Sequence, residues 1–220
     1  MDFKSAFYFL KKLARNNNRE WFEKRKPEYL QIKSDFEEFT AAVYDKLCES
    51  DPSLMGQDPR KMVFRIYRDV RFSKDKLPYK QFLSAGISSQ GKGTGVPGYY
   101  LQFEPGNRSF ACVGLYAPSS ESLAKIRQEI DYNGEALEKI MAEKTFRKYY
   151  SGFWEGDPLK TAPKGYPKDH PHIEWLKQRH FVIMHSLNDG DVLKKNLGQN
   201  VVKMLEAGKP FSDFLKHGLE

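Results

Sequence analysis

The chain has 220 residues, of which 40% are apolar and 30% charged, and its formal net charge is +7 at pH 7. A chain of this length forms one large or two small domains with a substantial core. No apolar run approaches the roughly 18 residues of a membrane span, and the N-terminus lacks the charged-then-apolar pattern of an export signal. We therefore expect no membrane partner. Only two cysteines occur, Cys48 and Cys112, which predicts buried, reduced thiols in a cytoplasmic protein.

The first part of the chain predicts two helices in succession. Asp2 can cap a helix over residues 3–14. Asn17 as N-cap, with Glu20 three residues later, is typical of a capping box that starts a short second helix.

A long helix follows, because Pro27 suits a first helical turn and the pattern continues to about Cys48. Apolar residues recur there at spacings of 3, 4, 3, 4 and 4, which is the period of one helix face. An aromatic stripe of this kind is typical of a core rather than of a ligand site. Its members are Tyr29, Ile32, Phe36, Phe39, Val43 and Leu47.

A run of β-strands is predicted after a loop at residues 50–60. No helix intervenes between the strands, which favours an antiparallel sheet. Because side chains alternate along a strand, one of the adjacent Tyr99 and Tyr100 should face the core. The four predicted segments are residues 61–67, 81–88, 98–104 and 108–116.

The last hundred residues predict mostly helix. Ser119 or Ser120 can cap a helix that runs to about Lys144, with Gly134 as a weak point. Residues 145–170 are rich in aromatic residues and broken by prolines, which predicts an ordered loop lying on the core. The predicted elements that complete the chain are a helix at 172–179, a strand at 181–185 and helices at 191–207 and 210–217.

These elements predict a single α+β domain over residues 1–220. Its parts are N-terminal helices within residues 3–48, a sheet region at 61–116, and a helical and loop region at 119–220. The fold expected is a central antiparallel sheet of about four or five strands, with helices at the N- and C-terminal ends.

The densest charge lies between Arg60 and Lys80. Eight lysines and arginines stand there against Asp69 and Asp75, so the stretch carries +6 of the formal +7. Aromatic residues are interleaved with these charges. Such a concentrated basic patch suggests an anionic partner and names no reaction.

Strand alternation would place Arg68 in an apolar row with Ile66 and Val70. A buried cation needs a partner. Two interpretations stay open, a structural ion pair with Glu20 or Asp35, or an arginine at the floor of an anion pocket. The other cations of the stretch form either the rim of that pocket or a solvated face paired with Asp69 and Asp75. These rim residues are Arg65, Arg71, Lys74, Lys76 and Lys80.

Three further patterns in the sequence are weaker. Residues 93–98 match Gly-x-Gly-x-x-Gly by letter, but a strand and not a helix follows, so a flexible hairpin loop that can carry Lys92 as a lid is expected. His170-Pro-His172 offers two nitrogens without a metal-binding spacing, so no metal or organic cofactor is expected. Ser73 is either a nucleophile beside a lysine or a serine that stabilises a turn.

Short motifs are spread along nearly the whole chain and form a recognisable set. They are Phe9-Leu10, Asn17-Asn18-Arg19-Glu20-Trp21-Phe22, Phe64-Arg65-Ile66-Tyr67-Arg68-Asp69, Arg71-Phe72-Ser73-Lys74-Asp75-Lys76, Pro78-Tyr79-Lys80, Gly98-Tyr99-Tyr100-Leu101, Tyr116-Ala117-Pro118, Leu123 with Ile126-Arg127, Pro163-Lys164-Gly165-Tyr166 and His170-Pro171. With this set the chain resembles the domain-of-unknown-function 2461 family, an uncharacterised group found in bacteria and fungi. The resemblance implies a single-domain intracellular protein and brings no established activity, substrate or cofactor. One departure is Ala111-Cys112-Val113-Gly114, where the family is richer in glycine.

The preferred hypothesis is a cytoplasmic protein that binds an anionic small molecule, such as a phosphorylated metabolite, or nucleic acid. One alternative is an enzyme in which Asp69 or Asp75 acts as acid or base. Another is a structural or protein-interaction domain. Trp21 is a further candidate for stacking on the ligand. The predicted ligand-binding residues are Arg65, Arg68, Asp69, Arg71, Ser73, Lys74, Lys76, Tyr79 and Lys80.

Overall fold

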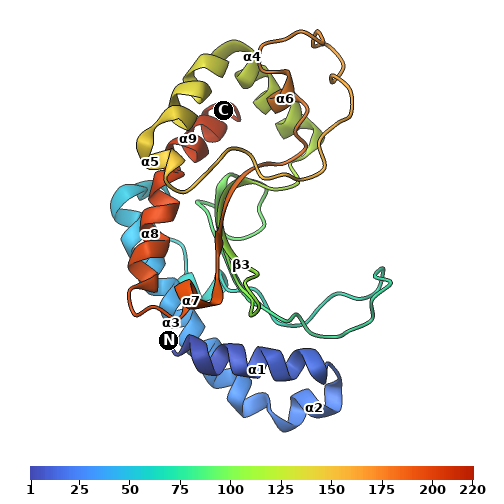
Figure 1. Cartoon of the computed structure of the whole chain (residues 1–220), viewed down its shortest axis with the longest axis vertical. Helices are drawn as coiled ribbons and strands as arrows, with labels where there is room; N and C mark the ends of the chain where they lie inside the picture. Colours follow the sequence, from blue (N-terminus) through green and yellow to red (C-terminus); the bar gives the residue numbers. More distant parts are fainter.

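A four-stranded antiparallel sheet lies at the centre of the chain, and the computed structural model describes all residues from 1 to 220 (Figure 1). Residues of the second and third strands alternate between buried and partly exposed positions, so the sheet has one covered face and one open face. The strands, in their spatial order, are β1 (Leu83–Ile87), β2 (Gly98–Phe103), β3 (Ser109–Leu115) and β4 (Phe181–Leu187).

Three helices pack on the covered face: α3 (Lys26–Ser50), α8 (Leu197–Ala207) and α9 (Lys209–His217). Figure 1 shows α3 and α8 together on one side of the sheet. Of the adjacent tyrosines, Tyr99 faces this core and is 3% exposed, as expected, while Tyr100 lies on the open face. The α+β class, the antiparallel sheet and the helices at both ends are as predicted.

The helical stripe of α3 forms much of the core. Five of its six members are buried, and Phe39 packs against the same cluster. The helix begins and ends within two residues of the predicted limits. The loop after it contains two short 3₁₀ turns, at Pro52–Leu54 and Pro59–Lys61.

The N-terminal helices α1 (Phe3–Arg15) and α2 (Arg19–Lys24) pack on α3. Asp2 caps α1 as expected. The predicted cap of α2 is wrong by one residue, because Asn18, and not Asn17, accepts the hydrogen bond from the Trp21 N–H. Asn17 is used elsewhere, at the base of the basic stretch.

The C-terminal half adds α4 (Ser120–Ala142), capped by Ser119, which packs on α9. A kink lies at Asn133, beside the glycine predicted as a weak point. Gly134 leaves room for the His172 ring, because a Cβ there would lie 2.1 Å from it. The short helices of this half are α5 (Lys144–Arg147), α6 (Ile173–Leu176) and α7 (Asp189–Val192).

The aromatic segment 145–170 is an ordered loop on the core, as expected. Phe146 and Tyr150 are buried, and the Tyr150 hydroxyl donates to the Met204 carbonyl at 2.7 Å. The backbone N–H of Trp154 donates to the Val182 carbonyl of β4 at 2.7 Å, which holds this part of the loop beside the sheet.

The prediction of a strand at residues 61–67 is wrong. Only isolated bridges form there, Val63 with Ala85 and Tyr67 with Tyr79. Alternation also fails beyond Ile66, since Ile66 is 2% exposed but Phe72 is 94% exposed. The chain leaves the sheet at this point, and sheet periodicity no longer governs its side chains.

Both cysteines are free. Cys48 is buried in α3 as expected, whereas Cys112 is partly exposed on the open face of the sheet. No helix combines the length and the apolar character needed to cross a bilayer.

Candidate functional site

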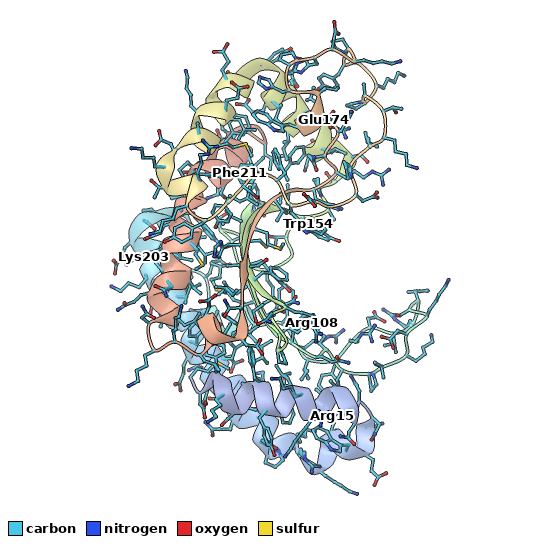
Figure 2. All side chains as sticks on the ribbon, in the orientation of Figure 1. Arg15, Arg108, Trp154, Glu174, Lys203 and Phe211 are labelled. Carbon is cyan, nitrogen blue, oxygen red and sulfur yellow. The ribbon has the colours of Figure 1, made fainter.

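A groove of about 900 Å³ lies over the open face of the sheet. Figure 2 shows Arg108 and Trp154 on the same side of the sheet, at its lower and upper ends, and both line the groove. The floor is made by the outward positions of the strands. These include Tyr100 of β2, Phe110 and Cys112 of β3, and Met184 of β4.

A basic arm, residues 65–80, projects from the body on the side opposite to α3 and α8 (Figure 1, teal). Its two limbs are joined at the base by backbone hydrogen bonds, Lys80 N–H to the Ile66 carbonyl at 2.7 Å and Arg68 N–H to the Pro78 carbonyl at 2.9 Å. The segment that precedes the arm runs beside β1, because the Phe64 N–H donates to the Ser84 carbonyl at 2.9 Å. The arm therefore begins at the β1 edge of the groove.

Asn17 holds the base of the arm to the helices. Its side-chain amide donates to the Tyr79 carbonyl at 2.9 Å, and its side-chain oxygen accepts the Tyr79 N–H at 3.1 Å. The Tyr79 ring stacks on Phe22 with centroids 4.0 Å apart and is 3% exposed. Tyr79, predicted to bind ligand, is therefore a buried structural residue. The ring of Trp21, the further stacking candidate, is covered by the Arg25 guanidinium, which lies 4.5 Å from the ring centroid.

Two of the predicted ligand-binding arginines are neutralised within the arm. Arg68 pairs with Asp75 at 2.6 Å and also donates to the Leu77 carbonyl at 3.1 Å. Its partner is thus neither Glu20 nor Asp35, the two carboxylates considered from the sequence. Arg71 forms a two-point contact with Asp69, at 2.7 and 3.0 Å.

The two aspartates of the arm stay charged. The Arg71 side chain lowers the pKa of Asp69, and the Leu77 N–H followed by Arg68 lowers the pKa of Asp75. A carboxylate held in this way is a poor proton acceptor at neutral pH. Both aspartates thus fit a role as partners of the arginines.

The far end of the arm is a turn. The Ser73 N–H donates to the Val70 carbonyl at 3.4 Å, and the Lys76 ammonium donates to the same carbonyl at 3.0 Å. Lys74 and Phe72 are exposed at this end. The position of Ser73 in a turn matches the structural interpretation of that serine.

Arg65, Lys80 and Lys92 form no ion pair, and we call them the cationic cluster. The ammonium groups of Lys80 and Lys92 lie over the ring of Phe64, and Arg65 is close enough to act on Lys80 by its charge. Lys74 and Lys76 also lack an ion pair but lie at the far end of the arm. The Lys80 ammonium lies 5.3 Å from the Phe64 ring centroid and 5.8 Å from that of Phe82, with no hydrogen-bond partner. Burial lowers the pKa of Lys80, and the charges of Arg65 and Lys92 lower it further.

Lys92 reaches the cluster from the glycine-rich loop. Its ammonium lies 5.1 Å over the Phe64 ring and donates to the Val63 carbonyl. Burial lowers the pKa of Lys92, Lys33 of α3 lowers it further, and Glu37 acts in the opposite sense. Lys33 and Glu37 pair with each other.

Gly86 of β1 makes the approach of Lys92 and Phe64 possible. A Cβ at this position would lie 3.2 Å from the Phe64 ring and 3.3 Å from the Lys92 Cβ. A larger residue would push both side chains away from the sheet. The loop therefore carries Lys92 as predicted, but Lys92 is packed against the sheet edge.

A row of three aromatic rings crosses the groove from this edge. Phe64 lies 6.0 Å from Tyr100, and Tyr100 lies 5.8 Å from Phe110, between ring centroids. All three are partly exposed. Tyr100 and Phe110 were not among the predicted ligand-binding residues. Alternation in the strands can place both on the open face, but their meeting with Phe64 depends on strand pairing.

At the lower end of the groove the positive and negative side chains neutralise each other. The Tyr100 hydroxyl donates to the Gln102 side chain at 3.0 Å, and Gln102 donates to Glu104 at 2.9 Å. Glu104 also pairs with Arg108. Arg108 is thus neutralised, and the free positive charge lies at the β1 edge.

The upper end carries a second aromatic group. Tyr116 is 65% exposed and stacks on His180, with ring centroids 4.4 Å apart. Trp154 lies 6.2 Å from Tyr116. The Ala117 N–H donates to His180 Nδ1 at 2.9 Å, which fixes the orientation of the imidazole.

Candidates for nucleophilic or metal chemistry do not converge in the groove. Burial raises the pKa of Cys112 to about 12, so its thiol is not a ready nucleophile. His170 bonds to Asp131 at 2.9 Å, whereas His172 stacks on Trp175. No group of three or more His, Cys, Asp or Glu side chains is arranged to hold a metal ion.

A comparison with protein families matches the model described as a conserved hypothetical protein (DUF2461) over residues 5–214. No curated protein and no solved structure matches the chain. Because the match spans nearly all of the 220 residues, the chain belongs to the DUF2461 family.

Proposed function

We propose that this protein binds a phosphate-bearing anion at the β1 edge of the groove, with the cationic cluster as the anchor. The observation that carries the proposal is the position of Lys80. Its ammonium is half-buried, has no carboxylate partner, and lies near two further cations that also lack one.

A cation withdrawn from water lowers stability unless it is paired or hydrogen-bonded. Elsewhere in the arm the chain supplies such partners, since Asp75 pairs with Arg68 and Asp69 with Arg71. Lys80 lacks one in the same stretch of sequence. Uncompensated charges of this kind concentrate at functional sites, where the ligand is the missing partner.

The composition of the cluster favours phosphate over a single carboxylate. Arginine offers a planar fork of donors and lysine a compact point charge, and both are common ligands of phosphate. Three neighbouring cations match a multiply charged anion better than a monoanion. The free thiols of Cys48 and Cys112 are typical of a reducing compartment, which supports a cytoplasmic location for this activity.

Thermal unfolding in the presence of tripolyphosphate tests the proposal. At a ligand concentration 100 times Kd the stabilisation is about 2.7 kcal/mol, which for a chain of this size raises Tm by roughly 5–10 °C. The test variant is Arg65→Ala/Lys80→Ala, and the matched control is Arg68→Ala/Arg71→Ala, which removes the same charge from the same arm.

We expect the test variant to lose at least about tenfold in affinity, and the control to lose much less. Equal losses would mean that only the net charge of the arm matters. The absence of any stabilisation of the wild type would contradict the proposal directly.

A further inference from the structure

We infer that the phosphate-bearing ligand is a single strand of nucleic acid that crosses the open face of the sheet. The inference rests on the proposed function for its phosphate anchor. It adds a second element, the row of rings Phe64, Tyr100 and Phe110, which we assign to the bases.

The row has the composition of a stacking platform. Every base has a flat face, so aromatic side chains beside a basic track bind single strands with little dependence on sequence. Here the rings begin where the cations are, because Phe64 is the ring that Lys80 and Lys92 contact. Phe64 and Lys92 line the groove together with Tyr100 and Phe110, and Lys80 adjoins them at Phe64, so the phosphate anchor borders the platform.

The spacing of the rings favours an extended strand. Ring centroids along the row are 6.0 and 5.8 Å apart, which exceeds the roughly 3.4 Å rise per nucleotide of a B-form strand. The planes of neighbouring rings are tilted by 58° and 34°, so each base would stack on its own ring and not on the next base. A duplex hides the faces of its bases and does not fit this arrangement.

The groove continues beyond the row to a second aromatic group. Tyr116 and Trp154 line its upper end, and Tyr116 is 65% exposed. A small phosphorylated metabolite would need one end of this surface, whereas a short oligonucleotide can use both. The groove, of about 900 Å³, is lined from Arg108 at one end to Trp154 at the other, which leaves room for more than one nucleotide.

Cross-strand aromatic pairs also stabilise sheets, so the rings must be tested by binding and not by stability alone.

Fluorescence anisotropy with labelled dT8 measures the affinity, and tripolyphosphate binding to the same proteins is measured by calorimetry. Tyr100→Leu and Phe110→Leu keep an apolar side chain, and Tyr132→Leu is the control, because Tyr132 is 72% exposed on α4 outside the groove.

We expect Tyr100→Leu and Phe110→Leu each to weaken dT8 binding about tenfold, the scale of one lost base stack, and to leave tripolyphosphate binding unchanged. Tyr132→Leu should change neither. The logarithm of dT8 affinity should fall against the logarithm of salt concentration with a slope of about −2, for three cations that contact phosphates.

The outcomes separate the two proposals. The nucleic-acid inference is overturned, and the anion site stands, if tripolyphosphate binds at the cationic cluster but dT8 does not. The same holds if the affinity for dT8 is unchanged in both Tyr100→Leu and Phe110→Leu. Equal affinity for dT8 and for a duplex of the same length also overturns it. If neither ligand binds, both proposals fall. Two ring variants are used so that a folding defect in one still leaves a decisive test.

Discussion

The side chain of Asn17 forms hydrogen bonds with both backbone groups of Tyr79, as a neighbouring β-strand would. It donates to the Tyr79 carbonyl at 2.9 Å and accepts the Tyr79 N–H at 3.1 Å, across 62 positions of the sequence. The basic arm is thereby held to the loop between α1 and α2. Lys80 is the next residue. Its backbone N–H donates to the Ile66 carbonyl at 2.7 Å, and its ammonium lies over the Phe64 ring.

Asn17→Ala should therefore loosen the base of the arm. Loss of two hydrogen bonds to partly buried backbone groups predicts a destabilisation of about 1–3 kcal/mol. Asn16→Ala is the matched control, because Asn16 makes one exposed bond to the Lys12 carbonyl. Hydrogen exchange of the Tyr79 and Lys80 amides measures the effect. Protection that stays at the wild-type level in Asn17→Ala would show that the arm is held by Phe22 alone.

The two adjacent tyrosines of β2 should respond differently to loss of the hydroxyl. Tyr99 donates to the buried Asp51 at 2.9 Å, whereas Tyr100 donates to Gln102 on the open face. Tyr99→Phe leaves a buried carboxylate short of a donor and should cost about 1–3 kcal/mol. Tyr100→Phe should cost less than about 1 kcal/mol. Denaturant unfolding compares them, and equal costs would contradict the assigned role of Asp51.

Asp51 also makes the free energy of unfolding depend on pH in the acid range. Burial acts to raise the pKa of Asp51, but bonds from Ser53, Lys216 and Tyr99 and the charge of Lys216 outweigh it, so the net pKa is lowered. A carboxylate with a lowered pKa in the folded state contributes stability that is fully present above its unfolded pKa and is lost as pH falls through the folded value. Acid unfolding should therefore be steep below about pH 4, the ordinary value for Asp.

Lys216→Met removes the cation beside Asp51 and should cost about 2–4 kcal/mol at neutral pH. It should also move acid unfolding to higher pH. Lys46→Met is the control, since Lys46 and Glu49 form an exposed pair, with side chains 64% and 67% exposed, that contributes little. An unchanged acid transition in Lys216→Met would contradict the role of this lysine.

Lys80→Met should raise stability and weaken anion binding. The substitution keeps the apolar stem and removes a charge that burial disfavours. Because the pKa of Lys80 is lowered in the folded state, wild-type stability should rise with pH between that pKa and the ordinary value near 10.4. The gain from Lys80→Met in Tm should therefore shrink at high pH. A variant less stable than wild type at neutral pH would show that the ammonium already has a compensating partner.

Much of the fold follows from local patterns. The spacing of the α3 stripe, the Ser119 cap and the inward position of Tyr99 are all visible in short stretches of sequence. Residues 61–67 have strand composition, yet only isolated bridges form there. Local β-propensity does not determine which strands pair. The contact of Asn17 with Tyr79, which holds the base of the arm away from the sheet, depends on residues far apart in the sequence.

The charge of residues 65–80 marks a candidate site, but it does not say which of the cations stay unpaired. A count of cations treats Arg68, Arg71 and Lys80 alike, whereas the folded arm pairs the first two and leaves the third free. Lys92 joins the cluster because a glycine-rich loop returns across Gly86. The spacing of residues in the sequence does not predict such contacts, because each depends on which strands become neighbours.

The ionisation of Lys80 tests the central claim most directly. We would follow the ε-carbon of Lys80 by NMR in protein with ¹³C-labelled lysine, assign it with Lys80→Arg, and titrate pH with and without tripolyphosphate. The account predicts a pKa below the ordinary lysine value in the free protein and an upward shift when the anion binds, because the anion favours the charged form. An ordinary pKa that tripolyphosphate leaves unchanged would contradict it.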